Sequence, residues 1–275
     1  MLRRRSGIEL KSPEQLVSMR RAGLVVAAAL QAAASAVKPG VSTTELDAVA
    51  ASVIRSSGAT PSFLGYHGFP AVTCISVDAE IVHGIPGSRV LAEGDSVSID
   101  CGAIVDGWHG DSAVTVQVGS GSESARALSE STRLAMWHGI AAARLGGTVG
   151  DVSAAIQGFV RGLATPYGIV EEYTGHGIGS AMHQPPDVPN LGRAGKGPKI
   201  VPGMALAIEP MLTAGDPANS VLDDDWTVVT DDGSLACHWE HTITVTEHGV
   251  WVLTSPDGGE AMLSEFGVPF GPLAD

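Results

Sequence analysis

Two aspartates are spaced so that they can share metal ions. Asp100 and Asp111 flank Asp106-Gly107, and an Asp-Gly pair is among the strongest signals for a two-residue β-hairpin turn. With those two residues as the turn, Asp100 pairs with Ala113, and both carboxylates point to one face, roughly 7–8 Å apart on a diagonal. That spacing can hold a metal pair about 3.5–4 Å apart, which is the arrangement of hydrolytic two-metal sites. The alternative is two exposed strand aspartates, although Asp is depleted in strands.

Three further residues have the types that complete such a site: His176, Glu209 and Glu240. Carboxylates in strands beside apolar neighbours are costly to bury unless they are paired or bound to metal. The combined donor set is rich in oxygen and contains no thiolate. Such a set disfavours a structural zinc site and suits two divalent ions, whose bridging water becomes hydroxide near neutral pH.

Four pairs of similar segments occur in the same order and indicate an internal duplication. The matching segments are residues 38–46 and 145–152, 82–86 and 175–179, 94–100 and 203–209, and 111–116 and 240–245. The duplication places three pairs of polar residues in equivalent positions: His83 and His176, Asp100 and Glu209, Asp111 and Glu240. We therefore expect two halves, residues 12–120 and 121–254, related by a pseudo-twofold axis, with these side chains at the seam between them.

The elements that must position these residues are helices and strands of an α+β fold. Ser12-Pro13-x-Gln15 and Ser42-x-x-Glu45 are both helix starts, with a capping hydroxyl and a side chain that bonds back to the cap. Further helices are predicted at residues 124–144 and 151–163, and strands at residues 97–118, 169–173, 205–208 and 242–245. Residues 58–74 are expected to form a loop, and residues 255–275 an irregular surface tail.

Composition limits the class of protein. The chain has 275 residues and a formal net charge of −14, and this acidic balance argues against a sequence-specific nucleic-acid binder. Its three cysteines, Cys74, Cys101 and Cys237, have no metal-like spacing and favour a reducing, cytoplasmic compartment. Residues 24–37 are almost wholly apolar, but they begin too far from Met1 for a signal peptide and are too few to span a bilayer. We expect a buried helix there and no membrane association.

Longer strings around the candidate ligands carry a family resemblance. Gly175-His-Gly-Ile-Gly-Ser-Ala-Met-His183, Ile208-Glu209-Pro210 and Trp239-Glu240-His241-Thr242, together with Asp100 and His109-Gly110-Asp111, resemble the motif set of type I methionine aminopeptidases. The likeness covers nearly the whole chain. It implies the pita-bread fold, a duplicated α+β unit whose antiparallel sheet is flanked by helices. Residues 1–275 would then form one catalytic domain, with a short extension at residues 1–11 and a tail at residues 255–275.

The resemblance also implies a role for each ligand. Two divalent ions (Co, Mn, Fe or Zn) would be bound, with Asp100 on one, Asp111 and Glu240 bridging both, and His176 with Glu209 completing the other. The bridging hydroxide would attack the first peptide bond, and Glu209 would relay the proton to the leaving amine.

Substrate contacts follow from the same resemblance. His183 would bond the peptide carbonyl and His83 would stabilise the tetrahedral intermediate, although each could instead be a hydrogen-bonded structural histidine. The methionine side chain would enter a pocket lined by Phe63, Tyr66, Phe69, Cys74 and Trp226. Taken singly, each of these five residues is explained equally well by core packing.

The chain departs from the family at two positions near the expected site. Phe63 is bulkier than the residue usual there and would narrow the pocket, and His238 replaces a more usual glutamine. Strand alternation places His238 on the ligand face, where it could donate a hydrogen bond to a metal ligand. His67, His109, His138 and His241 are interpreted by default as structural.

The expected function is removal of the initiator methionine from nascent chains, preferably before a small second residue, by a cytoplasmic monomer. For Arg3, Arg4 and Arg5 two interpretations remain: contact with the ribosome, or a basic tail that is simply solvated. Two alternatives remain. A proline-specific peptidase shares the ligands but usually carries a whole domain before the catalytic half, and a non-catalytic ribosome-associated relative typically loses metal ligands, all of which are present here.

Overall fold

A central antiparallel sheet organises the computed structural model, in which residues 7–274 are described and Arg3–Arg5 lie outside the described part. Its strand order is β1-β4-β5-β14-β9-β7-β8, with β2 also paired to β4 and β15 to β14. These strands are β1 (Thr60–Pro61), β2 (Thr73–Val77), β4 (Ser96–Val105), β5 (Trp108–Gln117), β7 (Gly175–Gly177), β8 (Gln184–Val188), β9 (Ala205–Ile208), β14 (Glu240–Val245) and β15 (Val250–Val252).

The sheet order is symmetric about the contact between β5 and β14. On one side β4 follows β5 and carries β2; on the other β9 follows β14 and carries β7. The strand pairs β4–β5 and β9–β14 come from the segments that the sequence identifies as repeats. This arrangement confirms the predicted duplicated α+β fold.

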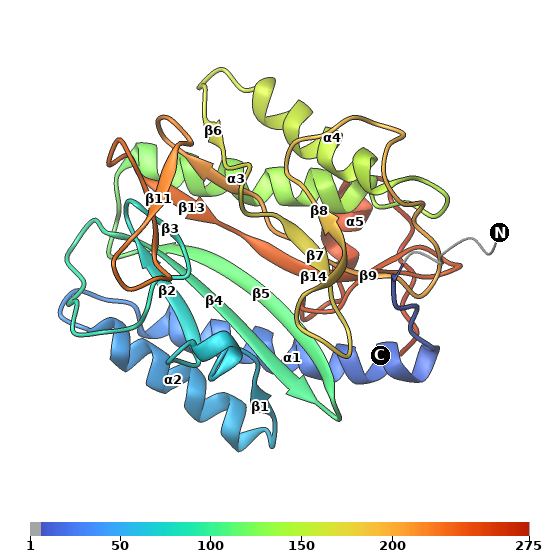
Figure 1. Cartoon of the computed structure of the whole chain (residues 1–275), viewed down its shortest axis with the longest axis horizontal. Helices are drawn as coiled ribbons and strands as arrows, with labels where there is room; N and C mark the ends of the chain where they lie inside the picture. The colour runs from blue at the N-terminus through green and yellow to red at the C-terminus, as the bar shows by residue number, and fades with distance from the viewer. Residues whose placement is uncertain (1–6, 275) are drawn as a thin grey trace.

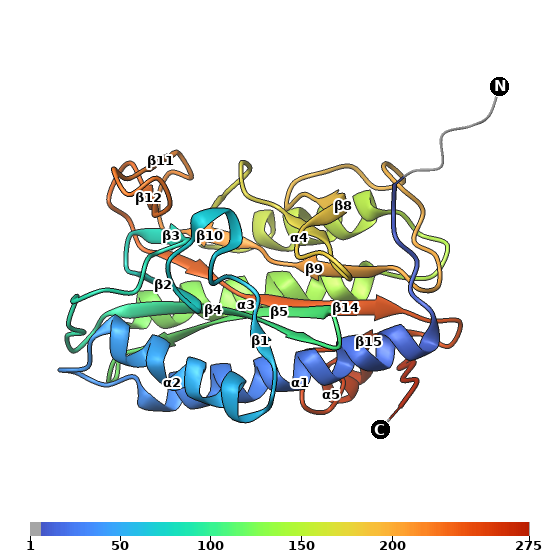
Figure 2. The same cartoon turned by 60° about the horizontal axis from the view of Figure 1, so that its bottom comes forward.

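Helices pack against each half of the sheet. The helix α1 (Pro13–Ala36) lies along β4 and β5 with α2 (Thr43–Ser56) beside it, whereas α3 (Glu123–Ala142) and α4 (Val149–Arg161) pack together over the second half (Figures 1 and 2). Both predicted capping boxes, at Ser12 and Ser42, are present. The helix α4 begins two residues earlier than predicted because Asp151 is the third helical residue of a capping box whose N-cap is Thr148.

Two small sheets complete the fold. One has the order β13-β10-β6 and the other β11-β12-β3. Their strands are β3 (Glu80–Val82), β6 (Gly168–Ile169), β10 (Met211–Thr213), β11 (Asn219–Val221), β12 (Val228–Thr230) and β13 (Ala236–His238). In the second of these sheets, β3 from the first half pairs with β12 from the second, so the halves are joined outside the main sheet as well.

Helix α1 is a core element despite its composition. Among the described residues it is the one helix long and apolar enough to cross a membrane, with a mean hydropathy of 1.3, and half of its most apolar stretch is buried inside the fold. Glycines allow its backbone to touch the sheet. A Cβ atom on Gly23 would overlap the Leu253 carbonyl, and one on Gly110 would lie 2.7 Å from the Gly23 nitrogen.

Replacing Gly23 by Ala is therefore expected to destabilise the protein by about 1–3 kcal/mol, because the added methyl group must push α1 away from backbone that cannot yield. The measurement is the free energy of unfolding in denaturant. Gly158→Ala in α4 is the matched control, since nothing lies within 4 Å of a Cβ there and Ala favours helix. Equal stabilities of the two variants would contradict the close approach.

Three expectations about secondary structure are wrong. Residues 58–74 contain β1, a 3-10 turn at Tyr66–Gly68 and the start of β2, whose five residues are all buried, so that no alternating pattern marks it. The strand expected at residues 169–173 is only the two residues of β6. The tail contains the helix α5 (Glu260–Glu265), which forms because Leu263 packs into the core.

Candidate active site

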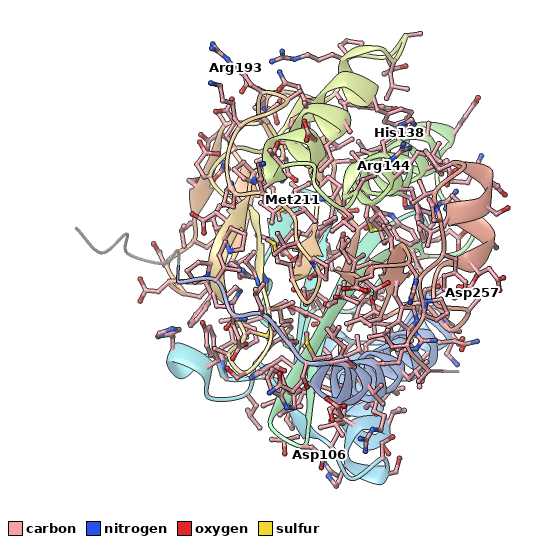
Figure 3. The ribbon with its side chains drawn as sticks, turned by 90° about the vertical axis from the view of Figure 1, so that its right-hand side faces the viewer. Asp106, His138, Arg144, Arg193, Met211 and Asp257 are labelled. Atoms are coloured by element: carbon pink, nitrogen blue, oxygen red, sulfur yellow. The ribbon has the colours of Figure 1, made fainter. Side chains whose placement is uncertain are left out.

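The strand register places three carboxylates on one face of the sheet. Asp100 of β4 pairs with Ala113 of β5, as predicted from the Asp106-Gly107 turn, and Glu240 of β14 pairs with Ala113 from the other side. Paired residues point to the same face, so Asp100 and Glu240 flank the small Ala113 side chain. Asp111 lies two residues from Ala113 and shares that face. The short alanine leaves space between the acids. The turn residue Asp106 lies away from them, at the outer edge of the molecule (Figure 3).

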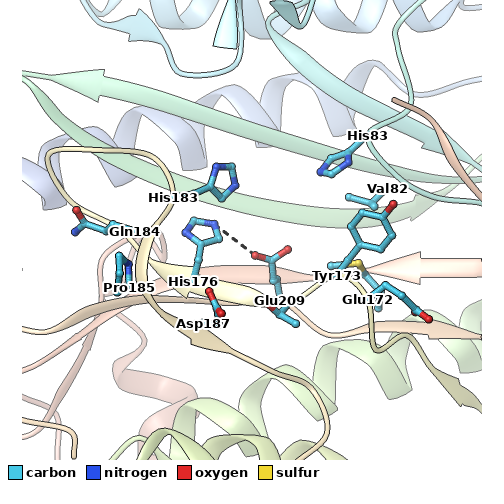
Figure 4. Close-up of a pocket in the computed structure, with 12 residues that line it drawn as sticks. Val82, His83, Glu172, Tyr173, His176, His183, Gln184, Pro185, Asp187 and Glu209 are labelled. Atoms are coloured by element: carbon cyan, nitrogen blue, oxygen red, sulfur yellow. Dashed lines mark ion pairs between the residues drawn. The ribbon is translucent and has the colours of Figure 1, made fainter. Parts of the chain in front are cut away.

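Two histidines approach the carboxylates from neighbouring strands. The Nε2 atom of His176 lies 3.5 Å from Glu209 Oε1 (Figure 4) and 3.9 Å from Asp111 Oδ2. The Nε2 atom of His238 lies 3.6 Å from the other oxygen of Glu209, Oε2. Ligand atoms of Asp111, His176 and Glu240, and likewise of Glu209, His238 and Glu240, lie within 4.8 Å of one another. Four predicted ligands thus lie together with His238, and Asp100, which is in neither group, lines the same cavity as those four.

Burial makes this cluster electrostatically costly without a cation. Asp100, Asp111 and Glu240 are each at most 8% exposed, and each has a carboxylate oxygen without a hydrogen-bond partner. Burial raises the pKa of Glu209 to about 8, and burial together with the charge of Glu209 raises that of Asp100 to about 7. Burial and the neighbouring carboxylates raise the pKa values of Asp111 and Glu240 well above the ordinary range. Divalent cations fit this donor set, because they would neutralise the repulsion and occupy the free oxygens.

This electrostatic balance predicts a pH dependence for stabilisation by metal. Carboxyls with raised pKa values bind more protons when folded than when unfolded, so their contribution to stability is present below about pH 4 and is lost as the pH rises through about 7 to 8. Buried histidines act in the opposite direction, because burial lowers the pKa of His176 to about 3 and that of His241 to about 4. A divalent ion must displace the carboxyl protons at pH 5 but not at pH 8, so adding it to chelator-treated protein should raise the Tm more at pH 8 than at pH 5. An equal rise at both pH values would contradict the assignment.

An aromatic pocket opens directly onto the carboxylates. Its volume is about 290 Å³, and its wall contains every predicted pocket residue: Phe63, Tyr66, Phe69, Cys74 and Trp226. Asp100, Asp111 and Glu240 form the polar end of the lining. The ring of Phe69 packs edge-on against that of Trp226, with centroids 5.0 Å apart. The pocket is therefore apolar along its wall and acidic at one end.

A second cavity of about 430 Å³ meets the first one at the same polar groups. Both cavities are lined by His83, His176, His183 and Glu209, and the second extends past Tyr173 and Asp187 (Figure 4). An extended chain could therefore occupy both cavities, with one of its bonds at the carboxylates.

The two histidines predicted to contact substrate lie at the junction of the cavities. Nδ1 of His183 is 2.8 Å from Tyr66 Oη, which leaves Nε2 of His183 free of this contact. The ring of His83 lies edge-on to Tyr173, with centroids 5.6 Å apart, and burial lowers the His83 pKa to about 4. Sequence reasoning missed Tyr173 and the bond between Tyr66 and His183, because no local pattern marks either one.

The remaining histidines are held mainly by structural contacts. Nδ1 of His109 lies 3.0 Å from Ser62 Oγ, and Nδ1 of His241 lies 2.8 Å from Thr254 Oγ1, on the opposite face from Glu240 as predicted. His138 stacks on Phe159 at the outside of α3 (Figure 3). His67 differs from these three because it lines the aromatic pocket.

Comparisons with known proteins agree with this geometry. The profile of metallopeptidase family M24 matches residues 17–247. Methionine aminopeptidase 1 of Mycobacterium tuberculosis is 53% identical, over 92% of this chain and 97% of its own length. Methionine aminopeptidase 1 of Bacillus subtilis is 47% identical, over 89% of this chain and 98% of its own length.

Solved structures support the same conclusion. Methionine aminopeptidase from Thermotoga maritima superimposes with a TM-score of 0.88 at 39% identity, over 90% of this chain and 99% of that one. The prolidase from Pyrococcus furiosus has a TM-score of 0.72 at 22% identity, and this chain covers 65% of it, so this likeness shows the shared fold alone. With its pita-bread fold and its buried cluster of acids and imidazoles, the chain belongs to metallopeptidase family M24.

Proposed function

We propose that the chain is a dinuclear-metal methionyl aminopeptidase that removes the N-terminal methionine from polypeptides, preferably when the second residue is small. The observation that carries the proposal is the aromatic pocket of about 290 Å³ with the carboxylate cluster at its end. An unbranched apolar side chain such as that of methionine suits such a pocket, and its backbone would then lie at the polar groups. The relatives named above as methionine aminopeptidases support the same assignment.

The carboxylates would hold two divalent ions in this proposal. Asp111 and Glu240 would bridge the ions, Asp100 would bind one, and His176 with Glu209 would complete the other. Two such ions polarise a peptide carbonyl and lower the pKa of bound water toward neutrality. Which of Co, Mn, Fe or Zn is bound is left open, since all four accept these ligands.

The protein's own groups would orient the peptide and move the proton. Glu209, which lines both cavities, would relay a proton from the attacking water to the leaving amine. When the Tyr66 hydroxyl donates to Nδ1 of His183, the His183 proton lies on Nε2, from which it can be donated to the substrate carbonyl. His83, which lines both cavities, would stabilise the oxyanion.

The proposal extends to the setting of the reaction. The substrates would be the N-termini of nascent polypeptides in the cytoplasm, processed by a monomer that neither enters a membrane nor reads nucleic-acid sequence. A transient contact with the ribosome would involve the basic residues 3–5, which lie outside the described part.

Incubation of the metal-loaded protein with three peptides tests the proposal. We expect release of methionine from Met-Ala-Ser, slower release from Met-Leu-Ser, and no cleavage of an Ala-Pro peptide. Cleavage of the proline peptide alone would support the proline-specific alternative. Failure to cleave any peptide with Co²⁺, Mn²⁺, Fe²⁺ or Zn²⁺ would support a non-catalytic protein.

A further inference from the structure

His238 is a second imidazole inside the carboxylate cluster, and its Nε2 atom accepts or donates no hydrogen bond in the described part of the chain. Its side chain is 1% exposed. A buried polar atom without a partner destabilises the fold, so we expect a ligand at this atom. The only ionisable group within ion-pair distance among the described residues is Glu209.

The backbone of His238 is fixed, so that the direction of its ring is set by the fold. His238 ends β13, and its N–H donates to Ser98 Oγ of β4 and Thr115 Oγ1 of β5. The Thr115 hydroxyl in turn donates to the His238 carbonyl at 2.7 Å. These bonds attach β13 to the hairpin that carries Asp100 and Asp111, which holds the imidazole beside the acids.

The distances fit shared coordination of a metal ion and do not fit a hydrogen bond. The separation of 3.6 Å between His238 Nε2 and Glu209 Oε2 is too long for a hydrogen bond. Two ligand atoms about 2.1 Å from one tetrahedral ion lie roughly 3.4 Å apart. The separation between His176 Nε2 and Glu209 Oε1 is nearly the same, at 3.5 Å. Glu209 thus presents one oxygen to each imidazole.

We propose that His238 Nε2 is a direct metal ligand, completing with Glu209 and Glu240 a position for one of the two ions. The inference rests on the dinuclear centre of the proposed function. Glu240 belongs to both groups of ligand atoms, Asp111–His176–Glu240 and Glu209–His238–Glu240, so it can reach both ions. Each ion then has one nitrogen ligand, and Glu209 also reaches both positions, with Oε1 beside His176 and Oε2 beside His238. Imidazole suits zinc, iron and cobalt better than it suits manganese, so the second position becomes more selective for those ions.

Zinc binding by the full-length His238→Gln variant tests this inference. We expect zinc affinity at one of two sites to fall at least tenfold, because loss of even a hydrogen-bond partner of a ligand costs 10–100-fold. Affinity for Mn²⁺ should change less, since the glutamine amide oxygen replaces the nitrogen. His248→Gln, the same change at an exposed histidine, should bind zinc as the wild type does. Circular dichroism and the Tm of the metal-free proteins confirm that each variant folds.

X-ray absorption at the zinc edge supplies a readout that is independent of turnover. The zinc-loaded wild type should show two imidazoles for two zinc ions, and His238→Gln should show one. Equal imidazole counts would overturn the inference, even if Met-Ala-Ser is cleaved and the proposed function stands. A lower count in the variant, combined with no peptide cleavage by the wild type, would leave the ligand assignment intact and refute the proposed function.

Discussion

Asp111→Asn is expected to lower kcat/KM for Met-Ala-Ser on the order of 10³-fold or more. Loss of a residue that only hydrogen-bonds to a metal ligand costs about 10–100-fold, and Asp111 is proposed to be a ligand itself. Asp111 lies at the centre of the sheet, between the groups contributed by β4 and β14, and its side chain is almost fully buried. An amide in its place removes a negative charge and one bridging oxygen from the cluster. The measurement combines steady-state kinetics with metal content after dialysis, and metal content should fall in parallel with activity.

Asp106→Asn is the matched control for this change. It is the same substitution on the same hairpin, at an exposed turn residue whose ion pair with Arg21 is largely solvent-exposed. Asn accepts the positive φ of 51° found there, and surface ion pairs contribute little, so kinetics and metal content should stay at wild-type values. An Asp111→Asn protein as active as the Asp106→Asn protein would refute the bridging role.

Glu209→Gln is expected to lower kcat by about 10²–10⁴-fold, the usual contribution of a positioned general acid or base. Its carboxyl lies at the junction of both cavities, where it can reach a peptide bond that spans them, and burial raises its pKa in the metal-free protein to about 8. Glutamine keeps an oxygen that can bind metal but cannot carry the proton. The kinetics should therefore be measured at saturating metal, with KM changing less than kcat.

Glu171→Gln controls for the change from acid to amide. Glu171 is exposed and is part of neither cavity lining, so its variant should turn over like the wild type. A Glu209→Gln protein that binds two ions and retains wild-type kcat would exclude Glu209 from proton transfer. If it instead loses metal, Glu209 acts chiefly as a ligand.

Local chemistry explains which features were predictable from the sequence. The register of Asp100 against Ala113 follows from one Asp-Gly turn and the period of a strand, and the starts of α1 and α2 follow from their capping residues. Each of these patterns is complete within about twenty residues, so no knowledge of the rest of the fold is needed.

Features that depend on distant partners were not predictable in the same way. All five residues of β2 are buried, where the strand pairs with β4 and packs against α2, and α5 forms because Leu263 packs into the core. The contact between Tyr66 and His183 joins residues 117 positions apart. The distance between His238 and Glu209 likewise depends on how β13 is bonded to the hairpin, although strand alternation does place His238 on the correct face.

Two cations lying between the halves of the chain are the central requirement of the proposed mechanism. An anomalous-scattering map from crystals soaked in Co²⁺ or Mn²⁺ tests this directly. Two peaks about 3.5–4 Å apart between Asp111 and Glu240 are expected, the spacing of two-metal hydrolytic sites. A map without a peak between these carboxylates, from crystals whose protein cleaves Met-Ala-Ser, would contradict it.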